Sequence, residues 1–260
     1  MSDSEPPPQD ERSRSDSPSL IPTTQQRTGL ATVGVLDVLL LIAGMLLVGF
    51  GVTLGFRSLL GAAGLEWLAL PLIVVVQSLG FLALLWLVVL QRRHLDWRCL
   101  GLKPAPPAWL GRAVVLGLGA VPVAMAINYL VQALLGETWE NPQIETLAPE
   151  GGSLASGMVL LLLVSFVVPF VEELLFRGLL FAWLAERWSL ALAYPLSALA
   201  FASLHFLLPL FPALFLMGLL LAYVYRESGS IWAPIIVHGL FNGLMLSVVL
   251  MARSFAPEVV

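Results

Sequence analysis

The chain has 260 residues, of which 58% are hydrophobic and only 12% are charged, and its formal net charge is −4. Soluble domains carry about a quarter charged residues, so this composition excludes an ordinary soluble protein and predicts an integral membrane protein. No basic patch and no alternation of basic and aromatic residues is present, which argues against nucleic-acid binding. The single cysteine, Cys99, excludes an intramolecular disulfide and a zinc site built from cysteines.

The first 28 residues differ from the rest of the chain. They are polar and rich in Ser, Pro, Asp and Glu, and they lack the basic start and cleavage site of a signal peptide. Such a composition predicts a disordered tail over residues 1–28. We expect residues 29–260 to form one membrane-embedded helical domain.

Seven apolar segments approach or exceed the length of about 20 residues that spans a bilayer. The predicted fold is therefore all-α, a polytopic membrane helix bundle of about seven transmembrane spans. The segment Phe176–Arg187 either continues the fourth span or forms a separate amphipathic helix along the interface. The seven segments cover residues 30–56, 67–90, 111–136, 154–176, 189–206, 210–225 and 230–252.

The basic residues fall mainly on one side of such a bundle. The loop after the third span carries four glutamates and no Lys or Arg, whereas the tail and the loops after the second, fourth and sixth spans are basic. Lys and Arg accumulate in cytoplasmic loops, so the N-terminus is expected to be cytoplasmic. The basic residues after these spans are Arg92, Arg93, Arg98, Lys103, Arg112, Arg177, Arg187 and Arg226.

Ionisable residues interrupt the apolar fourth span at Glu172, Glu173 and Arg177. Each costs at least a few kcal/mol in hydrocarbon, so such groups tend to be paired and functional. Glu173 and Arg177 are four residues apart on one helix face and are expected to form an ion pair. Glu172 points about 100° away from Glu173 and is free to act as a general base in the bundle interior.

Two further polar clusters follow in the last spans. His238 and Asn242 are four residues apart on one face, and the Asn242 amide can donate to a developing oxyanion, alone or with the imidazole. His205 comes from a third helix. Glu172, His205 and His238 could converge on a divalent metal such as zinc, or on a water without any metal, and the spacing leaves both open.

The predicted span limits create one conflict. They place Glu172 and His238 near the cytoplasmic ends of their helices but His205 near the opposite end of its own helix. Convergence requires that this helix start later or tilt, or that its neighbours be broken. Kinks at Pro169 and Pro234 would open space for water beside the polar residues.

Three other polar residues in the spans have simpler interpretations. Asn128 and Gln132 share a face of the third span and are expected to be helix-packing contacts. Asp37 near the start of the first span is expected at the membrane interface.

The three clusters resemble the motifs of the CPBP intramembrane protease family, also called the CAAX protease and bacteriocin-processing or Abi family. Glu172, Glu173 and Arg177 fill its EExxxR motif, Phe201 and His205 fill FxxxH, and His238 and Asn242 fill HxxxN. The order and spacing agree at every motif position. The resemblance covers about residues 155–250, within a protease-like core over 154–252.

The resemblance implies a membrane-embedded peptidase site in a helical bundle, in a protein of the bacterial inner membrane. By family analogy, Glu172 and His205 activate a water, His238 and Asn242 stabilise the oxyanion, and Glu173 with Arg177 orders the site. The implied substrate is a membrane-associated peptide or protein, either a prenylated CAAX protein or a leader peptide, with membrane lipids as surroundings. A metal-free glutamate mechanism is slightly preferred over zinc held by Glu172, His205 and His238.

Two other classes of function stay open at the level of sequence. One is a non-proteolytic immunity or scaffold protein that binds peptides or partner proteins. The other is a small transporter that uses the same charges as a proton relay. The oligomeric state and the substrate are not predicted.

Overall fold

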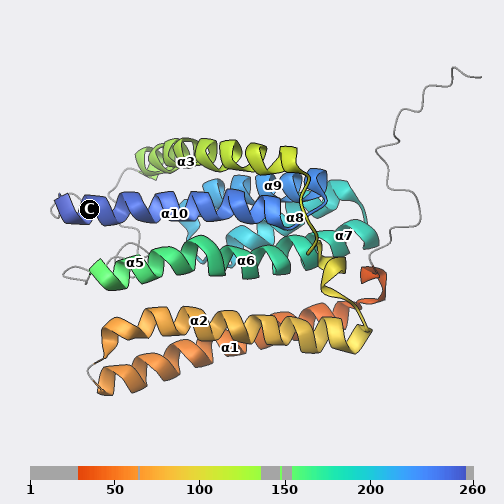
Figure 1. The fold of residues 1–260 in the computed structure, drawn as a ribbon, viewed down its shortest axis with the longest axis horizontal. Helices are drawn as coiled ribbons and strands as arrows, with labels where there is room; N and C mark the ends of the chain where they lie inside the picture. The colour runs from red at the N-terminus through yellow and green to blue at the C-terminus, as the bar shows by residue number, and fades with distance from the viewer. Residues whose placement is uncertain (1–28, 64, 136–146, 148–153, 256–260) are drawn as a thin grey trace, which may run out of the picture.

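The computed structural model describes residues 29–63, 65–135, 147 and 154–255. All regular elements within these ranges are helical, and they pack as the predicted polytopic bundle, so the all-α prediction is confirmed. The prediction for the tail over residues 1–28 and most of the acidic loop after the third span lie outside the described residues. Figure 1 shows α1 and α2 as a pair along one side of α5 and α6, with α10, α3 and the α8–α9 pair on the other.

The first three predicted spans are long helices. A single turn, η2 (Leu30–Thr32), precedes α1 (Val35–Ala62), and α2 (Glu66–Leu84) continues into the π-helical segment η3 (Leu85–Gln91). The short helix η4 (Trp97–Leu100) lies in the basic loop before α3 (Pro107–Leu135). Each of the three is long and apolar enough to cross a bilayer.

The fourth span is one continuous helix of 33 residues, Ala155–Arg187. It is built from α5 (Leu154–Leu162), η5 (Leu163–Val167), α6 (Val168–Glu173), η6 (Leu174–Phe181) and α7 (Ala182–Arg187), of which η5 and η6 are π-helical. Of the two interpretations of Phe176–Arg187, continuation of the span is the one observed. At 1.5 Å per residue the helix is about 50 Å long. Glu172 therefore lies near its middle, and the predicted position near the cytoplasmic end is wrong.

The fifth predicted span, residues 189–206, is not a full-length span. The helix there, α8 (Leu190–Ser203), has 14 residues and reaches about 21 Å, which is shorter than a hydrocarbon core of about 30 Å. The chain then turns, with Phe206 at a left-handed φ of 55°, and returns through η7 (Leu208–Leu210) and α9 (Phe211–Ser228). Among the described residues, six helices are long enough to span a membrane.

The short α8 resolves the conflict over His205. Because α8 ends early, His205 lies in the turn between α8 and α9, inside the bundle and close to the middle of the fourth span. In Figure 1, α7, α8 and α9 gather toward one end of the bundle, whereas the start of α5 and the end of α10 (Trp232–Phe255) lie at the other.

Small residues bring the site-bearing helices close together. A Cβ at Gly239 of α10 would overlap the carbonyl oxygen of Ser165 in η5, and one at Gly243 would lie 2.5 Å from the Ser165 hydroxyl. A Cβ at Gly218 of α9 would similarly lie 2.8 Å from the Cα atom of Ala198 in α8. Close approach at small residues four apart is a common means of helix association in membranes. It fixes the depth of His238 and Asn242 against the fourth span.

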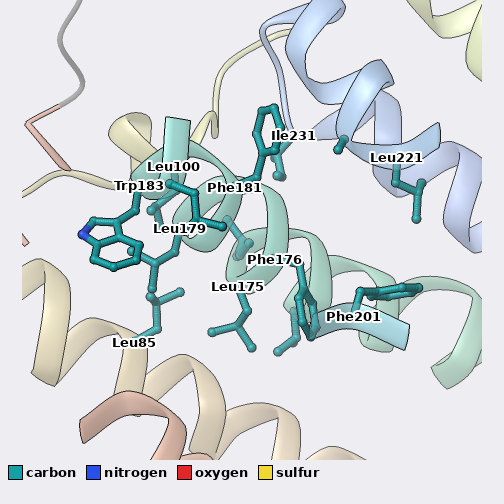
Figure 2. Close-up of a cluster of buried hydrophobic side chains, with 14 of the residues drawn as sticks. Leu85, Leu100, Leu175, Phe176, Leu179, Phe181, Trp183, Phe201, Leu221 and Ile231 are labelled. Carbon is teal, nitrogen blue, oxygen red and sulfur yellow. The ribbon is translucent and has the colours of Figure 1, made fainter. Parts of the chain in front are cut away.

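A buried apolar cluster surrounds η6 and α7 (Figure 2). Phe176 and Phe201 meet edge to face, with ring centres 5.2 Å apart. Trp183 of α7 donates through its indole N–H to the carbonyl of Val33, at 2.9 Å. The carbonyl oxygen of Leu100 would lie 2.7 Å from a Cβ at Gly178, so η4 packs directly on η6. The start of α1 and the basic loop are thereby tied to the helix that carries Glu172.

Candidate active site

Glu173 is the centre of a buried polar network. Its Oε1 accepts from Nη1 of Arg177 at 2.8 Å and lies 2.8 Å from Nδ1 of His238. All three residues are at most 2% exposed. The predicted ion pair on one helix face is therefore formed, and it extends across to α10. Because a carboxylate only accepts, the hydrogen of this imidazole contact belongs to Nδ1 of His238.

Arg177 makes contacts on three sides. Besides Glu173, it donates through Nη2 to the carbonyl of Gly218 on α9, at 3.3 Å. Its guanidinium carbon lies 4.5 Å from the ring centre of Phe201, which is within the range of a cation–π interaction. Arg177 thus connects the fourth span, α8 and α9 at the depth of the site.

Glu172 differs from its neighbour in exposure and in partners. Its side chain is 26% exposed, and its Oε2 lies 3.8 Å from Nε2 of His238. That oxygen has no hydrogen-bond partner among the described residues. Glu172 is therefore the more exposed of the two carboxylates, and His238 is held between them.

His205 is oriented by its own helix end. Its Nδ1 lies 2.8 Å from the carbonyl oxygen of Phe201, so Nδ1 carries the hydrogen and Nε2 is left as an acceptor. The Phe201 ring contacts both imidazoles, with ring centres 4.9 Å from His205 and 5.6 Å from His238. The sequence identifies Phe201 only as a motif position, and the structure shows it as a common packing surface for Arg177 and both histidines.

Asn242 is held by the fourth span. Its Nδ2 donates to the carbonyl of Val164 in η5, at 3.3 Å. Pro169 follows this segment and has no N–H to offer to the carbonyls of the preceding turn, which leaves them available to α10. An amide NH₂ group has two hydrogens, so one remains for a ligand.

Glu172, His205 and Asn242 line one cavity of about 310 Å³. The cavity extends along α10 from Phe241 to Val249, and α3 contributes Ala124 and Asn128 to its wall. His238 is not among its lining residues and lies behind Glu172 instead. The structure thus places three of the six predicted site residues on a shared surface and the other three, Glu173, Arg177 and His238, in the buried network behind it.

A second cavity, of about 560 Å³, meets Glu172 from the other side. Its lining comes from α1, α2, η6 and the turn after α8, and is mostly apolar, including Met45, Phe50, Phe81 and Phe206. Glu172 lines both cavities. The carboxylate therefore lies where an apolar space and a more polar one meet.

The zinc hypothesis requires three converging ligands. Within the described part of the chain, no group of three or more His, Cys, Asp or Glu side chains is arranged to hold a metal ion. Glu172, His205 and His238 do not fit that requirement as placed, since His238 is engaged by Glu173 and lies off the cavity that Glu172 and His205 share. We therefore derive no step through a metal.

Comparisons with known proteins agree with the motif resemblance. Residues 154–244 match the family model described as type II CAAX prenyl endopeptidase Rce1-like. A protein of Bacillus subtilis (strain 168) named "Putative membrane peptidase YdiL" is 27% identical over 135 residues, which are 52% of this chain and 52% of that protein. The chain thus aligns with about half the length of this curated relative. No solved structure was found to be significantly similar.

Proposed function

We propose that this integral membrane protein is an intramembrane endopeptidase that uses a glutamate-activated water, a proposal supported by the match of residues 154–244 to the Rce1-like family model of CAAX prenyl endopeptidases. The observation that carries the proposal is the shared cavity. Glu172, His205 and Asn242 come from three separate elements and face one space inside the membrane bundle. A base, a second proton acceptor and an amide donor on one surface are what peptide hydrolysis needs.

In the proposed reaction, a water lies between Glu172 and His205. The Glu172 carboxylate removes a proton from this water while the water oxygen attacks the peptide carbonyl carbon. Nε2 of His205 accepts the second hydrogen of this water as a hydrogen bond and so orients it. The proton held by Glu172 then passes to the amine nitrogen as the C–N bond breaks. The products are a carboxylic acid and an amine, so atoms and charges balance.

The oxyanion is assigned to the free amide hydrogen of Asn242. His238 does not line the cavity, and its Nε2 faces Oε2 of Glu172 at 3.8 Å, so its proposed role is to position that carboxylate. Glu173 and Arg177 fix the ring of His238 and do not touch the substrate. Oriented donors in a site that excludes water are worth about 10²–10³ in rate each.

For the substrate we propose a peptide with an attached lipid, as in prenylated CAAX proteins. The apolar cavity beside Glu172 offers a place for an isoprenoid chain, and burying apolar groups there is favourable by roughly 25 cal/mol per Å². The peptide itself would enter the more polar cavity that holds His205 and Asn242. A leader peptide without a lipid would use only the more polar cavity, which holds His205 and Asn242.

The test is cleavage of a fluorogenic peptide with a farnesylated CAAX end by the purified protein, compared with the same peptide without the lipid. We expect cleavage of the farnesylated form, and a loss of about 10²–10⁴ in rate for Glu172→Gln with the thermal unfolding temperature preserved. Activity of Glu172→Gln within a few-fold of wild type would remove Glu172 from its assigned role. Peptide binding without cleavage by the wild type would favour the scaffold alternative.

Metal dependence is tested on the same protein. The proposed mechanism predicts that activity survives prolonged chelation and that metal analysis finds no stoichiometric zinc. About one zinc per chain, with activity lost on removal and restored on addition, would turn the histidines into ligands and replace this mechanism.

The proposed orientation has the Lys- and Arg-rich end on the cytoplasmic side of a bacterial inner membrane. Because α8 and α9 enter from and return to the same end, the sidedness of the other helices does not depend on whether that pair crosses fully. Cysteines introduced at Glu145 and Arg187 should react with a membrane-impermeant reagent from opposite sides. Reaction of both from one side would contradict the topology.

A further inference from the structure

Another cavity, of about 530 Å³, lies where α7 and α9 end. Its walls come from η4 and the residues after it, from the stretch between the end of η6 and the start of α8, and from the end of α9. It shares no lining residue with the two cavities that meet Glu172. We call it the basic cavity, and its charged lining residues are Arg98, Lys103, Glu186, Arg226 and Glu227.

Backbone contacts hold two of these walls together. The N–H of Ile231 donates to the carbonyl of Gly101 at 2.8 Å, and the hydroxyl of Ser230 donates to the carbonyl of Lys103 at 2.5 Å. A Cβ at Gly229 would lie 3.8 Å from Nζ of Lys103. The ammonium group of Lys103 therefore lies beside the turn between α9 and α10, and the basic loop is fixed against that turn.

The three cations of the basic cavity are not used in ion pairs. Within the described ranges, the carboxylates that form ion pairs are Asp37, Glu172 and Glu173, and none of them pairs with Arg98, Lys103 or Arg226. Because two glutamates also line the cavity, its charged side chains carry three positive and two negative charges, a net charge of +1. This surplus matches a ligand with one negative charge.

A purely structural role explains only part of this cluster. Cations at the C-terminal end of a helix interact favourably with its dipole, which accounts for Arg226 in the last turn of α9 and for Lys103 beside it. Arg98 belongs to η4 and is exposed to solvent. The dipole of α9 therefore gives no reason for Arg98 to line the same cavity.

The other side of the basic cavity is apolar and leads to the outer surface of the bundle. Phe181, Ala182, Ala185 and Leu190 line it. Leu190 is 40% exposed at the start of α8, and the exposed Trp188 precedes it, as is usual for aromatic residues at a membrane interface. A ligand of this cavity can thus combine one anionic group with apolar chains. Basic pockets between membrane helices on the cytoplasmic side bind anionic lipid headgroups.

We propose that the basic cavity binds the headgroup of an anionic phospholipid. The phosphate diester accepts hydrogen bonds from Arg98, Lys103 and Arg226, since guanidinium and ammonium groups bind phosphate oxygens well. The acyl chains leave along Leu190 into the surrounding bilayer. This site does not depend on the proposed peptidase function, because none of the residues assigned to the chemistry lines it.

The experiment titrates the purified full-length protein in neutral detergent with phosphatidylglycerol and measures bound lipid by native mass spectrometry and the unfolding temperature. A ligand that binds the folded state raises that temperature with concentration, so we expect a rise with phosphatidylglycerol. Phosphatidylcholine with the same acyl chains, and inorganic phosphate at equal ionic strength, should each give a much smaller rise. An equal rise with phosphatidylcholine would overturn the selectivity for an anionic headgroup, and an equal rise with inorganic phosphate would overturn a lipid as the ligand.

Three variants test the cavity itself. Arg98→Gln and Arg226→Gln should each weaken phosphatidylglycerol binding about fivefold, the equivalent of about 1 kcal/mol per basic residue near an anionic lipid. Glu227→Gln should tighten binding by a similar factor, because it removes a negative charge from the lining. Arg112→Gln is the matched control, since Arg112 is a basic residue early in α3 that does not line the cavity, and its binding should equal that of wild type.

Equal weakening by Arg112→Gln and Arg98→Gln would show a general attraction of lipid to a basic surface and overturn the proposal. Unchanged binding in Arg98→Gln and Glu227→Gln would overturn it as well. Both of these side chains are exposed, so their replacement should leave the fold intact and the test does not depend on Arg226→Gln.

Discussion

Asp37 and Glu173 are both carboxylates with no exposed surface, yet they lie in different surroundings. Asp37 is in the first turn of α1, where its Oδ2 accepts from the backbone N–H of Gly34 and from Nε of Arg93, each at 2.8 Å. Nε of Arg92 lies 3.6 Å from its other oxygen. Glu173 is at mid-helix and shares one oxygen between Arg177 and His238.

The difference lies in what the partners can do. Arg92 and Arg93 have side chains 51% and 31% exposed, so either can turn to water if its carboxylate is lost. Arg177 is 1% exposed and cannot. Asp37 accepts hydrogen bonds from a helix start and from the basic loop. Glu173 fixes an imidazole that faces the cavity-lining Glu172. Burial alone therefore does not mark a functional carboxylate; its connection to a cavity does.

The largest loss of stability and of activity is expected for Glu173→Gln. It leaves the Arg177 charge buried without its counter-ion, which costs about 3–5 kcal/mol of folding stability. It also weakens the hold on His238, so the rate of peptide cleavage should fall as well. Thermal unfolding in detergent and the reporter assay measure the two losses.

The double variant Glu173→Gln/Arg177→Met separates the two losses. Removing both charges together is often neutral for stability, so the unfolding temperature should recover in large part. Cleavage should not recover, because His238 still lacks its carboxylate. Recovery of both would mean that Glu173 serves stability only, as Asp37 does.

A smaller effect is expected from Gly239→Ala. The added methyl group would overlap the Ser165 carbonyl, so α10 must move away from η5 at a cost of about 1–3 kcal/mol. This movement displaces His238 and Asn242, and cleavage should fall. Gly119→Ala on α3 is the matched control, since its Cβ would meet no atom within 4 Å. Equal behaviour of the two variants would show that the close approach does not position the site.

Asp37→Asn should have a still smaller effect. The amide oxygen can keep the Gly34 contact, and the two arginines can reach water, so we expect a loss of about 0.5–2 kcal/mol, the usual range for a helix cap. Activity per folded molecule should equal that of wild type in the reporter assay. A loss of cleavage without a loss of stability would connect Asp37 to the site and contradict the distinction between the two carboxylates.

Much of the bundle follows from sequence, because its main signal is local. Runs of apolar residues mark the long helices, and a spacing of four residues predicts the Glu173–Arg177 pair. The length of α8 was not predictable from hydropathy, since the apolar run through Leu204 and Phe206 continues past the end of the helix at Ser203. The turn there depends on tertiary packing.

The contacts between helices also could not be predicted from the sequence. Motif spacing grouped His238 with Asn242, but their partners lie on the fourth span, and only the structure shows that Glu173 is engaged by both Arg177 and His238. Asn128 carried no motif, and its amide resembled that of Gln132. The position of Asn128 on the cavity wall could not be predicted, because the cavity forms only when the helices pack together.

The smallest effect concerns Cys99 in η4, the loop helix that packs on Gly178 of the fourth span. Burial, with smaller contributions from the charges of Asp96 and Glu186, raises the pKa of the Cys99 thiol to about 11. At neutral pH the thiol is therefore protonated, and its alkylation should be on the order of a hundredfold slower than that of a free cysteine with a pKa near 8.5. The rate should rise about tenfold per pH unit up to the pKa, because only the thiolate reacts. Labelling with a maleimide at increasing pH measures this, and a free-cysteine peptide is the control. Fast labelling at neutral pH would contradict the prediction and show that η4 does not stay packed on the fourth span. In that case Cys99 would have to be replaced by Ser before cysteines introduced at Glu145 and Arg187 could report the topology.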